Sequence, residues 1–68
     1  MKDWSLIYIT RSLPEGNIIK GMLEENNIPV MLMNKQDSSY LNFGDIELYV
    51  PKVWRDLAKQ LVDKALLN

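Results

Sequence analysis

The sequence predicts an α+β fold, in which three strands form an antiparallel sheet and two helices cover one of its faces. Two observations support this prediction. Three short segments alternate their side chains with the period of a strand, and two longer segments place apolar residues at the period of a helix. The chain has 68 residues, too few for two hydrophobic cores, so we expect one domain that spans residues 1–68.

The first strand is predicted from Trp4 to Thr10, where aromatic and β-branched residues dominate. Simple alternation assigns one face of this strand to Trp4, Leu6 and Tyr8, and the other face to Ile7 and Ile9. Because both sets are apolar, we expect burial on both sides of the strand, by the helices on one side and by a different partner on the other.

The first helix is predicted to begin after Ser12, because Ser12 and Glu15 have the spacing of a capping box, in which each side chain accepts the other residue's N–H. The helix is expected to end at 26–29, since Asn27 tolerates a left-handed backbone and Pro29 disfavours helix at the residue before it. We expect close packing on the sheet to explain Gly21, which lies beside the apolar stripe.

Two further strands are predicted, from Pro29 to Met33 and from Asp45 to Val50. In the second of them, alternation points Ile46, Leu48 and Val50 inward, and Glu47 and Tyr49 outward. In the first, Val30 and Leu32 share one face, and Met31 and Met33 share the other. A final helix is predicted to begin at Pro51, with Trp54 on its apolar stripe and in the core.

The order strand, helix, strand, strand, helix packs most simply as a sheet in the order 1-3-2 with both helices on one face. This is a ferredoxin-like βαββα arrangement without a fourth strand, and it leaves the outer edge of strand 1 unpaired. We therefore expect a homodimer. The candidate interface residues are Trp4, Leu6, Ile7, Tyr8 and Ile9.

Composition excludes several classes of function. The chain has no cysteine and no histidine, which removes thiolate and imidazole metal ligands and the usual general base near neutral pH. Its 8 basic and 9 acidic residues are scattered, so no basic face for nucleic acid can be drawn, and no apolar run approaches the ~20 residues of a membrane span. We expect a cytoplasmic protein that is not an enzyme, with no cofactor, no metal, and neither nucleic acid nor membrane as a partner.

The connection from Asn34 to Gly44 is longer than a hairpin needs, which favours a functional loop. Its candidate ligand-binding residues are Asn34, Lys35, Gln36, Asp37, Ser38, Ser39 and Tyr40. Such a loop can hold a small polar ligand through backbone N–H groups, hydroxyls and an aromatic ring, and the alternative is a solvated connection. A cation site of Asp37, Asp45 and Glu47 matches no calcium-loop spacing, and a serine nucleophile lacks a histidine base.

Three segments carry a resemblance: LPEGNIIKGMLEENNIPV at 13–30, NKQDSSY at 34–40 and FGDIELYVP at 43–51. In these segments the chain resembles a small bacterial family described as prokaryotic signal-transducing proteins, especially members from Bacteroidetes-type bacteria. The resemblance implies a ferredoxin-like fold and a signalling role, and it supplies no catalytic residues. We expect a non-enzymatic binding or regulatory module that senses a small polar ligand through residues 34–44. The alternative is a protein-interaction module that uses the edge of strand 1 or the open sheet face.

Overall fold

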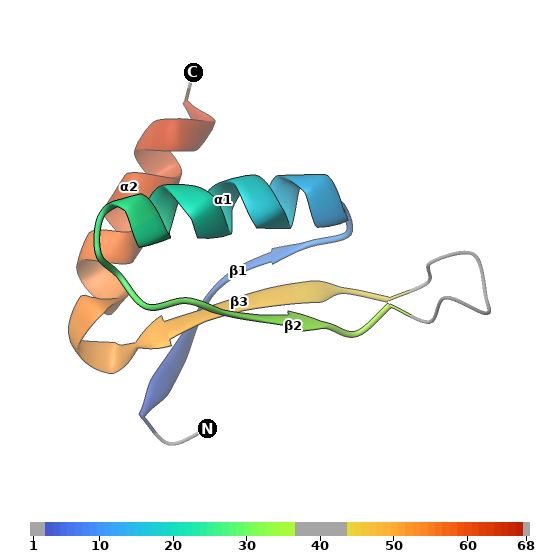
Figure 1. The fold of residues 1–68 in the computed structure, drawn as a ribbon, viewed down its shortest axis with the longest axis horizontal. Coiled ribbons are helices and arrows are strands. Elements are labelled where there is room, and N and C mark those ends of the chain that lie inside the picture. Colours follow the sequence, from blue (N-terminus) through green and yellow to red (C-terminus); the bar gives the residue numbers. More distant parts are fainter. Residues whose placement is uncertain (1–2, 37–43, 68) are drawn as a thin grey trace.

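The computed structural model describes residues 3–36 and 44–67 and has the predicted order of elements. These are β1 (Trp4–Thr10), α1 (Leu13–Glu25), β2 (Met31–Asn34), β3 (Ile46–Pro51), a 3₁₀ turn (Lys52–Trp54) and α2 (Arg55–Leu66). The strands form an antiparallel sheet in the order β1-β3-β2, and both helices lie over the same face of it (Figure 1). The α+β, ferredoxin-like fold predicted from the sequence is confirmed. Neither helix in the described part of the chain has the length and apolar character to cross a membrane.

The core lies between the sheet and the two helices. All three inward side chains of β3 are fully buried, as its alternation predicts: Ile46, Leu48 and Val50. Leu48 and Val50 pack with buried residues of α1 and α2, namely Ile19, Leu23, Ala58 and Val62, and with Ile28. The helices therefore cover only the β3 face that carries Leu48 and Val50.

The N-terminal end of α1 is capped by a local hydrogen bond. The Ser12 hydroxyl accepts the N–H of Glu15 at 3.2 Å, as predicted, but the Glu15 carboxylate accepts the Tyr8 hydroxyl at 2.9 Å instead of the Ser12 N–H. That N–H is donated to the Thr10 hydroxyl at 3.0 Å. Half of the predicted capping box is therefore replaced by contacts to β1, which sequence spacing alone does not reveal.

The prediction that close packing explains Gly21 is wrong, because a Cβ at Gly21 would meet nothing within 4 Å. The glycine that approaches the sheet is Gly16, where a Cβ would lie 3.3 Å from Cγ2 of Ile46. Gly16 is on the buried stripe of α1 with Ile19 and Leu23, whereas Gly21 lies on the opposite side of the helix.

The final helix begins later than predicted. Pro51 is the last residue of β3, and the 3₁₀ turn intervenes before α2. A 3₁₀ turn has three residues per turn, so the apolar stripe of α2 does not continue through it in register. Trp54, predicted in the core, is consequently 37% exposed.

Candidate functional site

The sheet face opposite the helices is apolar, and the described elements leave it uncovered. Paired residues of antiparallel strands lie on the same face, and two rows cross the sheet here: Leu6–Tyr49–Met31 and Ile9–Glu47–Met33. Trp4 extends the face through its pairing with Pro51. We call this the open sheet face, made of Trp4, Leu6, Ile9, Met31, Met33, Glu47 and Tyr49. Three of its apolar side chains are clearly accessible: Leu6 at 38%, Ile9 at 49% and Met33 at 37%.

A β-bulge in β1 determines which residues reach this face. The register shifts between Leu6, which pairs with Tyr49, and Tyr8, which pairs with Leu48. The extra residue at the bulge resets the alternation, so Ile9 returns to the face of Leu6, while Ile7 and Tyr8 pack against the core. The predicted grouping of Tyr8 with Trp4 and Leu6, and of Ile9 with Ile7, is therefore wrong.

The single charged residue on the open sheet face is held by two neighbours. The Glu47 Oε1 accepts the Tyr49 hydroxyl at 2.7 Å and lies 3.0 Å from the Lys35 ammonium. These contacts, the Tyr49 hydrogen bond first, hold the pKa of Glu47 below its ordinary value. The same carboxylate raises the pKa of Lys35 and of Tyr49. Glu47 is therefore ionised and paired at neutral pH, which suits a structural role better than proton transfer.

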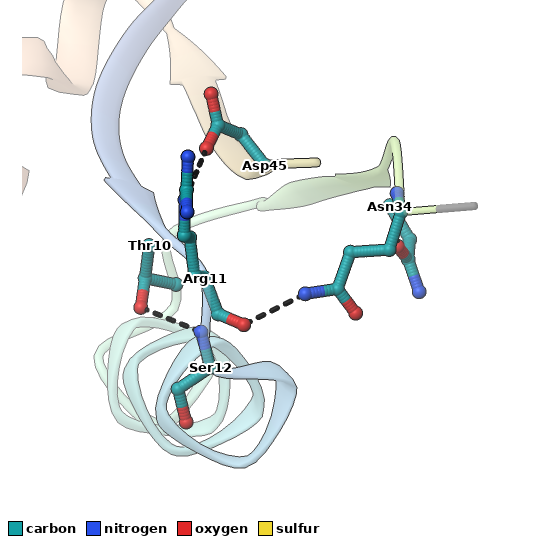
Figure 2. Close-up of polar contacts among 6 residues, drawn as sticks. Thr10, Arg11, Ser12, Asn34 and Asp45 are labelled. Atoms are coloured by element: carbon teal, nitrogen blue, oxygen red, sulfur yellow. Dashed lines mark hydrogen bonds and ion pairs between the residues drawn. The ribbon is translucent and has the colours of Figure 1, made fainter. Parts of the chain in front are cut away.

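The described part of the predicted ligand loop is bound to the rest of the protein. The side-chain amide of Gln36 donates a hydrogen bond to the Arg11 carbonyl at 2.7 Å, and the backbone N–H of Gln36 donates one to the side-chain oxygen of Asn34 at 2.9 Å. The N–H of Lys35 is donated to the Asp45 carbonyl at 2.9 Å. Figure 2 shows Arg11 beside Asp45, with the two charged groups 3.7 Å apart.

Asn34, Lys35 and Gln36 thus hold the base of the loop against β3 and the β1–α1 connection. Four other candidate ligand residues lie outside the described residues: Asp37, Ser38, Ser39 and Tyr40. The loop's binding of a small ligand stays a prediction.

The sequence-based candidate sites did not include Met31, Met33 or Tyr49, and Glu47 was weighed only as a cation ligand. The alternation of side chains does indicate these positions, because it places the two methionines on one face of their strand and points Glu47 and Tyr49 outward on theirs. What was missing was the register that joins these sets with Leu6 and Ile9 in one surface.

The described residues provide no evident metal centre. Asp45 and Glu47, weighed as cation ligands, instead lie against Arg11 and Lys35, and no cluster of three acidic side chains suited to a metal occurs within 3–36 and 44–67. Comparisons of the chain with protein-family models, with curated proteins and with solved structures gave no match.

Proposed function

We propose that this protein is a non-enzymatic interaction module that binds another protein chain through its open sheet face. One observation carries the proposal: apolar side chains from all three strands lie on the face where a free antiparallel sheet normally presents polar residues to water. Contiguous apolar surface on a small protein is a common mark of a protein-binding site. The signalling role implied by the family resemblance is the setting in which we propose that this binding is used.

Two features favour the face of the sheet over its edges as the binding surface. The outer strand β1 has a bulge at Leu6–Tyr8, and the other outer strand, β2, has only four residues and follows Pro29 closely. Bulges, short strands and proline are devices that discourage pairing at a sheet edge. Of the two surfaces named in the alternative above, the open face is therefore the stronger candidate.

Photo-cross-linking in cells of the source organism tests the proposal. A benzoylphenylalanine residue in place of Ile9, on the open sheet face, should form cross-links to protein that mass spectrometry can identify. The matched control is the same probe in place of Ile18, which is 72% exposed but lies on α1. Absence of cross-links at Ile9, or equal cross-linking at both positions, would contradict the proposal.

A further inference from the structure

We propose that the partner on the open sheet face is a second copy of this chain, packed face to face about a two-fold axis. This inference rests on the proposed function and names the occupant of that site. Antiparallel sheets with one apolar face commonly pack on one another in an aligned orientation about 10 Å apart. Three properties of the face point to a copy of the chain: its charge balance, its arrangement of polar and apolar rows, and its satisfied polar groups.

Charges at the open sheet face are balanced in pairs. Lys35 lies 3.0 Å from Glu47, and Arg11 lies 3.7 Å from Asp45, the residue that precedes β3. A strongly acidic or basic partner would find no opposite net charge among these two described pairs, whereas a second copy would meet no net repulsion from them. A neutral apolar surface of this kind is complementary to itself.

The order of the rows also suits a two-fold dimer. From one end of the face to the other, the Trp4 and Leu6–Tyr49–Met31 rows are apolar, the next row contains Glu47, and the Arg11–Asp45 pair lies beyond it. A two-fold axis near the Leu6–Tyr49–Met31 row brings the apolar rows of both copies together and places the two Arg11–Asp45 pairs at opposite rims. An apolar centre with a charged rim is the usual anatomy of a protein interface.

Polar groups on the face can be buried at low cost because they are already bonded within one copy. The hydroxyl of Tyr49 is donated to Glu47 at 2.7 Å, and the Glu47 side chain is only 16% exposed. Burial of a polar group that has lost its hydrogen-bond partner carries the full desolvation cost of that group. In the proposed dimer, the ring of the central Tyr49 faces the second copy while its hydroxyl keeps the hydrogen bond to Glu47.

The size of the face sets the expected strength of the dimer. The three strands, of seven, four and six residues, give a face of at most roughly 23 by 14 Å, or about 320 Å². This is smaller than the about 800 Å² per partner of a standard interface, so we expect a dissociation constant of micromolar order.

Sedimentation velocity of the full chain at protein concentrations from about 1 to 500 μM tests the inference. These concentrations bracket the expected dissociation constant, which is of about micromolar order. The wild type should pass from monomer to dimer, and Leu6→Glu should weaken the dimer by roughly 100-fold or more, since a buried unpaired charge is strongly unfavourable. Ile18→Glu, the same change at an exposed apolar residue on α1, should dimerise like the wild type. Circular dichroism checks that each variant folds, and Met33→Lys replaces Leu6→Glu if that variant does not.

Each outcome separates this inference from the proposed function. A wild-type chain that stays monomeric, or a dimer insensitive to both Leu6→Glu and Met33→Lys, overturns the second copy as the partner. If the chain is monomeric but Ile9 cross-links to a different protein in cells, the inference fails and the proposed function stands. If neither self-association nor cross-linking occurs, both fail.

Discussion

At the scale of single residues, the two glycines of α1 are in opposite environments. A Cβ at Gly21 would meet open space, whereas one at Gly16 would lie 3.3 Å from Cγ2 of Ile46. Gly21→Ala should therefore raise the free energy of unfolding by about 0.5–1 kcal/mol, because alanine restricts the unfolded chain and favours helix. Gly16→Ala should gain less, since Ile46 must move to admit the methyl group. Urea denaturation of both variants measures the difference, and an equal or larger gain at Gly16 would contradict this packing.

A second residue-scale prediction concerns the titration of Glu47. The Tyr49 hydrogen bond is the largest cause that lowers its pKa, followed by the Lys35 contact. In NMR titrations of the side-chain carboxyl, the midpoint should lie below 4.5 in the wild type. It should rise toward that value in Tyr49→Phe, and by a smaller amount in Lys35→Met. A larger shift in Lys35→Met would show that the ion pair dominates instead.

The same shift gives stability a defined dependence on pH. Because folding lowers the pKa of Glu47, the folded protein binds this proton less readily than the unfolded chain does. The stabilisation is therefore complete above the unfolded-state value of about 4.5 and is lost as pH falls through the lower, folded-state pKa. Glu15 acts in the same sense, since hydrogen bonds from Thr10 and Tyr8 lower its pKa.

At the scale of elements, α1 ends in a Schellman motif that depends on Asn27. The Ile28 N–H is donated to the Leu23 carbonyl at 3.1 Å, and Asn27 between them has a left-handed φ of 62°. Ile28 and Leu23 are both buried, which supplies the apolar contact typical of this motif.

The prediction at Asn27 is a contrast between two substitutions. Asn27→Ala should lower the free energy of unfolding by about 1 kcal/mol, because alanine lacks the short polar side chain through which asparagine tolerates the left-handed backbone. Asn27→Gly should retain or raise the stability, since glycine adopts this conformation without steric cost. Thermal unfolding followed by circular dichroism distinguishes the two, and equal stabilities would mean that the helix end rearranges.

Elements with a local cause were predictable from the sequence, and elements that depend on distant partners were not. The buried alternation of β3 and the Ser12 cap follow from residues within one strand or one turn. The bulge in β1 depends on how Tyr8 and Leu6 align with their partners in β3, which lie 40 and 43 residues later in the chain. Glu15 likewise bonds Tyr8 across the β1–α1 connection, and the spacing of the capping box contains no sign of that contact.

The candidate site follows the same division. The outward positions of Glu47 and Tyr49 were predictable from alternation, and so was the shared face of Met31 and Met33. Their union with Ile9 was not, because the bulge reverses the face that simple counting assigns to Ile9.

At the scale of the whole molecule, one face of the sheet packs against the helices, and the other is left uncovered by the described elements. Leu48 is fully buried between the sheet and the helices, while Ile9 is 49% exposed on the open sheet face. Leu48→Ala should cost about 2–5 kcal/mol, which is comparable to the entire stability of roughly 3–5 kcal/mol expected of so small a domain. Ile9→Thr keeps a β-branched residue in β1 and should change the stability of the monomer by only about 0.5 kcal/mol.

Protein concentration then separates folding from assembly. A partner that binds only the folded state raises the melting temperature as its concentration rises, and in the proposed dimer the partner is the chain itself. The wild-type melting temperature should therefore increase as the protein concentration rises from about 5 to 500 μM. These concentrations bracket the expected dissociation constant, which is of about micromolar order. Ile9→Thr should match the wild type at the lowest concentration and gain less with increasing concentration, because its loss lies in the interface. If Ile9→Thr instead lowers the melting temperature equally at every concentration, Ile9 supports the monomer and the open face has no separate role in assembly.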